Sequence, residues 1–165
     1  MSSVGTSGET IYDACRLGNE ARVLEYVRHG GCVTEHDANK MTLLHHAAFS
    51  GNVCIVDALL SVQPLQTINV DSIDMGGWTP LHYAADRGFV AVVDRLVQEG
   101  ANVNARDEMK RTPLYLAAGG GHLEVLQLLL RNGATRSVKS VAGITALECA
   151  KAGGKTEAMS ILEQQ

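Results

Sequence analysis

The chain has 165 residues, which suits one compact domain or one short array of repeats. Hydrophobic residues make up 45% of it, too many for a disordered protein, and aromatic residues only 4%, too few for a typical β-sandwich. The net charge of −4 does not indicate nucleic-acid binding. We expect neither a membrane span nor a signal peptide, because no long apolar run occurs and residues 1–9 lack a basic segment before an apolar core.

Four segments of the chain repeat one pattern. They are MTLLHHAAFSGN, WTPLHYAADRGF, RTPLYLAAGGGH and ITALECAKAGGK, with threonines at Thr42, Thr79, Thr112 and Thr145. These threonines are spaced by 37, 33 and 33 residues. Counting back 33 residues from Thr42 reaches Glu9, in ETIYDACRLGN, which keeps Ala14 and Gly18 in the same places. A fixed period of this length indicates an array of supersecondary units.

Each unit predicts two helices and a turn. In the third unit, Thr79 is suited to cap a helix that begins at Pro80, and Gly88 to end it in a left-handed turn. A second helix with an apolar stripe follows, which in the fourth unit is Leu123, Leu126, Leu129 and Leu130. Aspartates precede the next threonine by five residues, at Asp37, Asp74 and Asp107, and are expected to open a hairpin-like turn.

The run Thr79-Pro80-Leu81-His82-Tyr83-Ala84-Ala85 closely resembles the signature of the ankyrin repeat family, and the resemblance covers about residues 9–165. It implies an all-α solenoid of helix–turn–helix units joined by β-hairpin-like loops. We expect a flexible segment at 1–8, an N-terminal cap repeat at 9–41, repeats at 42–78, 79–111 and 112–144, and a C-terminal cap repeat at 145–165. Polar residues at core positions of the end units, such as Thr156 in place of Val90, favour a complete array.

The second unit is four residues longer than the two units that follow it. The extra residues fall within 61–66, where Pro64 prevents simple continuation of the second helix. Two interpretations stay open, a tolerated loop insertion and a functional element.

We find no convincing catalytic, cofactor or metal motif in the sequence. Gly154-Lys155-Thr156 resembles the last three residues of a phosphate-binding loop, but Cys149 occupies the position where that motif needs its first glycine. No Cys/His spacing typical of zinc occurs, and the resemblance gives His45 and His82 a structural role. The cysteines Cys15, Cys32, Cys54 and Cys149 contain no C-x-x-C pair, and we interpret them as reduced thiols. We therefore expect no enzyme, no cofactor and no metal, in an intracellular protein of the cytoplasm, the nucleus or both.

Binding residues are expected where the repeat constrains the side chain least, at the hairpin tips and on the exposed side of the first helices. The candidate protein-binding residues are Met41, Phe49, Met75, Trp78, Arg87, Met109, Arg111 and Ile144. Trp and Arg are enriched in binding hot spots and Met at interfaces. We expect Trp78, the only tryptophan, to be an exposed anchor; the alternative is that these side chains only cover the hairpins.

Charge is distributed unevenly along the chain. Residues 1–74 hold 4 basic and 9 acidic side chains, a net charge of −5, whereas residues 75–165 hold 10 and 9, a net charge of +1. The basic residues of one C-terminal group are Arg106, Lys110, Arg111 and Lys139. Their patch is either a solvated face or a site for an acidic or phosphorylated segment.

The family resemblance implies a non-catalytic interaction module that presents a concave surface, made by the hairpins and first helices, to a protein partner. An adaptor, an inhibitor and an assembly chaperone all fit this description. The alternatives are a structural scaffold or spacer, and a regulatory subunit of an enzyme complex. We expect a monomer that binds protein, and neither nucleic acid nor a membrane.

Overall fold

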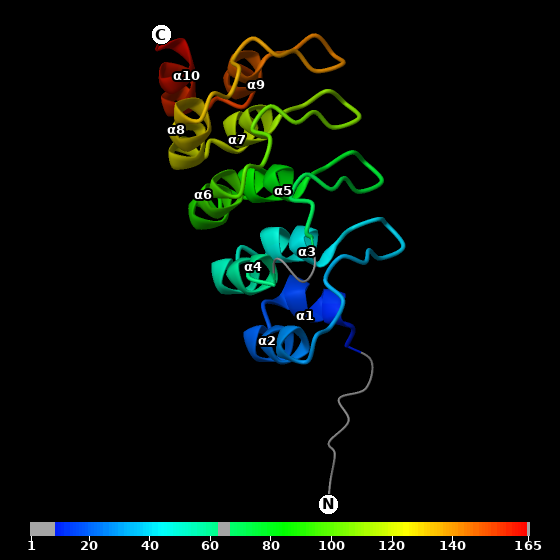
Figure 1. Ribbon diagram of the computed structural model, residues 1–165. Coiled ribbons are helices and arrows are strands. Elements are labelled where there is room, and N and C mark those ends of the chain that lie inside the picture. Colours follow the sequence, from blue (N-terminus) through cyan, green and yellow to red (C-terminus); the bar gives the residue numbers. More distant parts are fainter. Residues whose placement is uncertain (1–8, 63–66, 165) are drawn as a thin grey trace, which may run out of the picture.

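The computed structural model describes residues 9–62 and 67–164, and this part of the chain forms ten helices with one isolated β-bridge between His36 and Thr42. The helices are α1 (Ile11–Leu17), α2 (Glu20–Arg28), α3 (Leu43–Ser50), α4 (Val53–Leu60), α5 (Pro80–Asp86), α6 (Val90–Gln98), α7 (Pro113–Gly120), α8 (Leu123–Arg131), α9 (Ala146–Ala152) and α10 (Thr156–Glu163). They form helix–turn–helix pairs, numbered here as units one to five, which stack along one axis (Figure 1). The predicted all-helical solenoid is confirmed.

The stack has two layers of helices and a row of hairpins. The first helices of the units, α1, α3, α5, α7 and α9, pack in one layer, and the second helices, α2, α4, α6, α8 and α10, pack in the other. The hairpins between units project beyond the layer of first helices (Figure 1). We call the surface formed by the first helices and the hairpins the hairpin face.

Threonine caps set the start of the first helices. In units two to five, Thr42, Thr79, Thr112 or Thr145 accepts a hydrogen bond from the backbone N–H three residues on, as predicted. Unit one differs, because α1 is capped by Thr10, one residue later than the alignment to Glu9 predicts. Asp13 accepts a hydrogen bond from the backbone N–H of Thr10 at 3.1 Å and completes a capping box. Local capping chemistry, rather than the repeat spacing, fixes this helix start.

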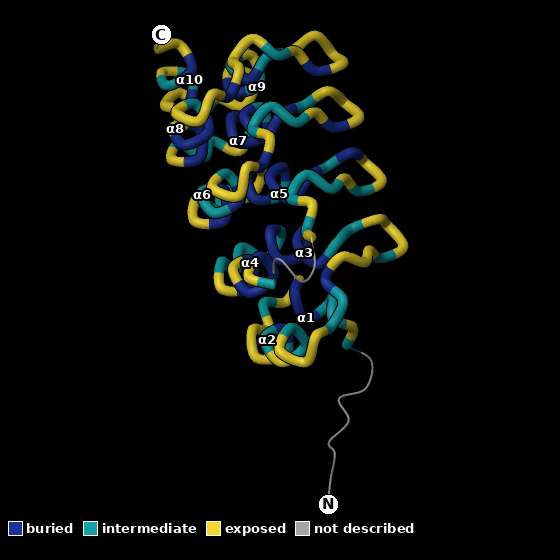
Figure 2. Tube along the Cα trace, in the orientation of Figure 1, coloured by how far each residue is buried: buried dark blue, intermediate teal, exposed yellow. Residues whose placement is uncertain are grey.

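The core lies between the helix layers and between successive units, and the hairpin tips are largely exposed (Figure 2). Leu96, Leu126 and Leu129 are fully buried, and each such burial stabilises the fold by about 1.5–3 kcal/mol. One core assignment is wrong: Val90 is 39% exposed, because it is the first residue of α6 and precedes the buried stripe. Thr156, at the equivalent place in α10, therefore does not mark an end unit.

The hairpins share one hydrogen-bond pattern. The backbone N–H of Asp74 donates to the Trp78 carbonyl at 3.0 Å, and Asp74 Oδ1 accepts from the N–H of Trp78 at 2.8 Å. Asp37 and Asp107 make the equivalent bonds, which confirms the predicted turns. Neighbouring tips are joined by backbone bonds from Met75 to Asn39 (3.0 Å), Glu108 to Gly76 (3.2 Å) and Val141 to Met109 (2.8 Å). The hairpins therefore form one continuous ridge.

Residues 1–8, 63–66 and 165 lie outside the described part of the chain. The flexible segment predicted at 1–8 thus stays a prediction. So do both interpretations of the insertion at 61–66, whose Pro64 falls among these residues. Before them, α4 ends at Leu60 with Ser61 as its C-cap.

Candidate functional site

Aromatic side chains gather on the hairpin face of units two and three. The ring of Phe49, on α3, lies 6.0 Å from the ring of Tyr83, on α5, with the two planes nearly perpendicular. The Trp78 ring, in the hairpin before α5, lies 4.9 Å from the Tyr83 ring. Such pairs contribute about 0.5–1.5 kcal/mol beyond the area they bury. We call Phe49, Trp78 and Tyr83 the aromatic cluster; it joins two units through side chains that are distant in sequence.

Two arginines stack on these rings. The Arg87 guanidinium lies 4.5 Å from the centre of the Phe49 ring and 5.6 Å from that of Phe89, so it bridges units two and three. The Arg111 guanidinium lies 5.4 Å from the Trp78 ring and is held by Asp107, with an Nη2–Oδ2 distance of 2.8 Å. Cation–ring contacts of this kind contribute about 0.5–1 kcal/mol where they are exposed.

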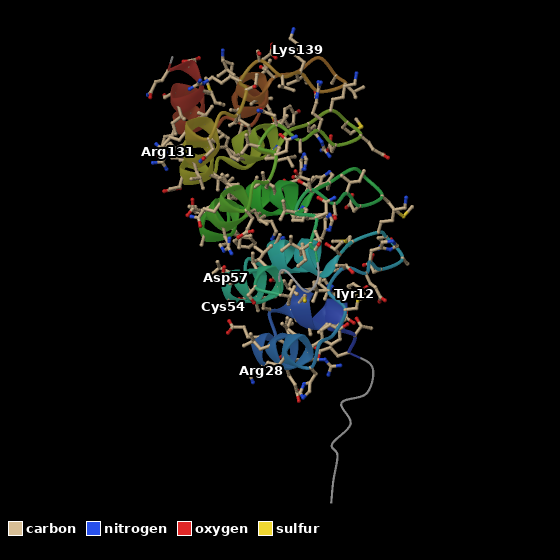
Figure 3. The ribbon with its side chains drawn as sticks, viewed as in Figure 1. Tyr12, Arg28, Cys54, Asp57, Arg131 and Lys139 are labelled. Atoms are coloured by element: carbon tan, nitrogen blue, oxygen red, sulfur yellow. The ribbon has the colours of Figure 1, made fainter. Side chains whose placement is uncertain are left out.

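A cavity of about 520 Å³ lies beside the aromatic cluster. It is formed by α1, the hairpin before α3, α3 itself and α5, and its lining residues are Thr10, Tyr12, Asp13, Arg16, Asp37, Asn39, Met41, His46, Phe49 and Tyr83. We call it the α1–α3–α5 cavity. Tyr12 lies on the side of the hairpins, whereas Cys54, Asp57 and Arg131 lie on the side of the second helices (Figure 3).

Three hydrogen bonds hold the Asp37 carboxylate of this cavity. Its Oδ1 accepts backbone hydrogen bonds from Asn39 at 2.8 Å and Met41 at 2.9 Å, and its Oδ2 accepts from Nε2 of His46 at 2.9 Å. Burial acts to raise the pKa of the Asp37 carboxyl, but these hydrogen bonds outweigh it and hold the pKa below its ordinary value. Asp37 therefore carries a negative charge at neutral pH.

The tyrosines of the cavity lie in a negative environment. The Tyr83 hydroxyl donates a hydrogen bond to Asp74 Oδ2 at 2.6 Å. Burial, followed by the Asp74 carboxylate, raises the pKa of Tyr83, and burial followed by Glu35 and Asp37 raises the pKa of Tyr12. Both phenols therefore stay neutral, next to fixed carboxylates.

The structure brings some of the predicted binding residues together and separates others. Met41 and Phe49 line the α1–α3–α5 cavity, and Trp78, Arg87 and Arg111 lie around it through the ring contacts. The remaining three are exposed along the hairpin ridge, Met75 by 61%, Met109 by 52% and Ile144 by 37%.

The expectation of an exposed tryptophan is wrong. Trp78 is half-buried rather than exposed, with its ring packed on Tyr83 and beneath the Arg111 guanidinium. Its carbonyl also accepts hydrogen bonds from Asp74 and His45. Trp78 is therefore part of the fold, whatever it contributes to binding.

Sequence reasoning did not select Tyr12, Tyr83, Asp37 or His46 as site residues. A signal for two of them was present, because Tyr83 and His46 occupy the same place in successive repeats, one residue after the structural histidine. That place faces the cavity in both units. Tyr12 was harder to find, because the start of α1 departs from the repeat alignment.

His45 and His82 have the predicted structural role. In each, Nδ1 accepts a hydrogen bond from the N-cap threonine's backbone N–H at 3.1 Å. Nε2 of His45 bonds the Trp78 carbonyl at 2.9 Å, and Nε2 of His82 bonds the Arg111 carbonyl at 3.2 Å. Burial lowers the pKa of both histidines, so both are neutral at pH 7.

Outside the α1–α3–α5 cavity, the features of the described chain that bear on function include possible metal ligands, cysteines, basic residues and apolar helices. Within residues 9–62 and 67–164, no group of at least three His, Cys, Asp or Glu side chains is arranged to hold a metal ion. The four cysteines are unpaired, and burial raises the pKa of the Cys15 thiol to about 12. In the basic group near the C-terminus, Arg106 donates to the Lys139 carbonyl at 3.2 Å. None of the described helices has the length and apolar character that a membrane span requires.

Comparison with known families agrees with this geometry. The sequence profile described as "Ankyrin repeats (3 copies)" matches residues 11–107 and again residues 93–164. The chain therefore belongs to the ankyrin repeat family, whose repeats are non-catalytic modules that mediate protein–protein interaction. No curated protein matches the chain.

Proposed function

We propose that the hairpin face of units one to three is a protein-binding surface, and that the chain acts by binding without catalysis. The observation that carries this proposal is the aromatic cluster beside a cavity of about 520 Å³. A few residues dominate the binding energy of an interface, and they are enriched in Trp, Tyr and Arg and cluster in well-packed pockets. Phe49, Arg87 and Met41 are the anchors, with Trp78 as their support.

The repeats supply an internal comparison that favours this surface. The positions of Phe49 and Arg87 are occupied in units four and five by small residues, Gly119, Gly120, Ala152 and Gly153. A spacer would require no such difference between units with the same backbone. Met75, Met109 and Ile144 extend the surface along the ridge, and Arg111 borders it as a rim residue.

An adaptor, an inhibitor and an assembly chaperone would all use this surface. In a scaffold, copies of the chain would bind one another, and in a regulatory subunit the partner would be an enzyme. Each role predicts a different bound protein, so the identity of the partner distinguishes them.

A capture experiment with paired variants tests the proposal. Immobilised wild-type chain, a Phe49→Ala/Arg87→Ala variant and an Arg28→Ala/Arg131→Ala variant are incubated with the same lysate, and bound proteins are quantified by mass spectrometry. Arg28 and Arg131 lie on the side of the second helices (Figure 3), so their loss should leave binding intact. We expect a set of proteins lost only from the first variant. Equal capture by all three chains, or none, contradicts the proposal, and light scattering that shows self-association favours the scaffold.

A further inference from the structure

The α1–α3–α5 cavity contains aromatic rings that no cation of the described chain covers. Tyr12, Phe49 and Tyr83 line it, and Met41 adds an apolar wall. The cation–ring contacts within the described residues use Arg87 on the two phenylalanines and Arg111 on Trp78, and none uses Tyr12 or Tyr83. The chain thus stacks guanidinium groups on neighbouring rings, whereas the Tyr12 ring contacts the imidazole of His46 and the Tyr83 ring contacts His45, Phe49 and Trp78. Both tyrosine rings still line the cavity, where a cation from outside the chain could reach them.

The charge around the cavity is negative. Two carboxylates, Asp13 and Asp37, line it, against one guanidinium, that of Arg16. Arg16 is already paired with Asp13 at 2.9 Å, whereas Asp37 pairs with no guanidinium or ammonium group of residues 9–62 and 67–164 and bonds instead to the imidazole of His46. The Asp74 carboxylate accepts a hydrogen bond from the Tyr83 hydroxyl, so it places a further negative charge close to that phenol. A cation entering the cavity would meet uncompensated charge of the opposite sign.

The size and polarity of the cavity restrict its occupant. A volume of about 520 Å³ falls in the range of specific binding pockets, about 300–1,000 Å³. One long side chain together with a neighbouring apolar side chain would fill such a space. A guanidinium suits it best, because Arg stacks on aromatic rings and pairs with carboxylates at the same time.

We infer that the α1–α3–α5 cavity binds a basic side chain, preferably arginine, from a linear segment of the protein partner, with an adjacent apolar residue against Met41 and Phe49. The inference rests on the proposed protein-binding function and specifies the chemistry of its ligand. The carboxylate of Asp37 pairs with the cation, the rings of Tyr12 and Tyr83 stack on it, and the negative surroundings exclude acidic segments.

Peptide selection provides the test. A library of short random linear peptides is displayed on phage and selected on the full chain. We expect the enriched sequences to carry Arg or Lys beside an apolar residue. The best binder is then synthesised with its basic residue and, separately, with citrulline, which keeps the shape of arginine but is neutral. Citrulline should weaken binding by about tenfold or more, and added salt should weaken binding of the basic peptide only.

Two matched pairs of variants locate the site. Phe49 and Phe89 both stack on Arg87, but only Phe49 lines the cavity, so Phe49→Ala should weaken binding about tenfold and Phe89→Ala by less than about twofold. Asp37 and Asp107 both accept the backbone N–H four residues on, but only Asp37 lines the cavity. Asp37→Asn should therefore weaken binding and Asp107→Asn should not. Thermal unfolding of each variant shows which of them fold.

Three results would overturn the inference: selected peptides without a basic residue, equal loss in the cavity and control variants, or no enrichment at all. The citrulline comparison uses the wild-type chain, so it stays decisive if Asp37→Asn fails to fold. Failure here is distinct from failure of the proposed function, because the capture experiment detects a protein partner whatever the charge of its contact segment.

Discussion

The imidazole of His45, on α3, holds the hairpin that leads to α5, because its Nε2 donates a hydrogen bond to the backbone carbonyl of Trp78, 2.9 Å away. His82 makes the same connection to the carbonyl of Arg111. Each histidine also accepts a hydrogen bond from its own N-cap threonine at Nδ1, so it must be neutral to make both bonds. These histidines therefore fix the hairpin before α5 to α3, and the hairpin before α7 to α5.

This arrangement predicts how stability depends on pH. Burial lowers the pKa of His45 and His82 in the folded chain below the ordinary value of about 6.5. The unfolded chain then takes up protons at a higher pH than the folded chain, so their contribution to stability is complete above about pH 6.5 and is lost as the pH falls below it. We expect a lower midpoint of urea unfolding at about pH 5.5 than at about pH 7.5.

A pair of double variants checks the assignment. His45→Gln/His82→Gln removes two of the buried imidazoles and should reduce the pH dependence between about pH 5.5 and 7.5. His29→Gln/His36→Gln makes the same substitution at two exposed imidazoles and serves as the control. The same slope in both double variants would show that other groups cause it.

Leu129 tests the packing between units. Its side chain is fully buried in α8, so Leu129→Ala should lower the free energy of unfolding by about 2–5 kcal/mol. Gln127, exposed on the same helix, is the control, and Gln127→Ala should change stability by less than about 0.5 kcal/mol. Chemical denaturation measures both. A small effect at Leu129 would mean that units four and five do not pack as described.

Alanine substitutions at two glycines distinguish the cost of left-handed backbone strain from the cost of a clash between neighbouring hairpins. Gly77 and Gly143 occupy the same hairpin position with nearly the same left-handed φ, 75° and 76°. A Cβ on Gly77 would lie 2.9 Å from the backbone nitrogen of Glu108 in the next hairpin, whereas a Cβ on Gly143 would meet nothing within 4 Å. Gly143→Ala should therefore cost only the left-handed strain, at most about 1–2 kcal/mol. Gly77→Ala should cost at least about 1 kcal/mol more.

Denaturation curves of the two alanine variants decide this prediction. Equal losses of stability would mean that the hairpin containing Glu108 moves away from the added Cβ without a change in the free energy of unfolding. The close contact between the two hairpins would then not stabilise the fold. Lys40 and Lys110 occupy the same position in the other hairpins with φ of 61° and 56°, so the backbone tolerates a side chain where the neighbour leaves room.

The repeat pattern predicts the parts of the fold that local chemistry determines. Helix caps at Thr42 and Thr79, the turns at Asp37 and Asp74, and the bridging histidines all follow from residue type and spacing. The site is different, because the pair Phe49–Tyr83 and the stacking of Arg111 on Trp78 join residues 34 and 33 positions apart. Periodicity aligns such positions but does not show which side chains will cover one another. Trp78 was expected to be exposed for this reason.

Trp78 decides between a structural and a purely binding role for the aromatic cluster. Because its ring packs on Tyr83 at 4.9 Å and beneath Arg111, Trp78→Ala should lower stability by about 1–3 kcal/mol as well as weaken partner binding. Trp78→Phe keeps a ring against Tyr83 and should lose less than about 1 kcal/mol. Thermal unfolding measures the first effect, and titration with the selected peptide measures the second. If Trp78→Ala melts like the wild type but binds the peptide weakly, the indole acts only at the interface, as its place in the sequence suggested. If both variants lose stability equally, the ring contact with Tyr83 is not what holds the cluster together.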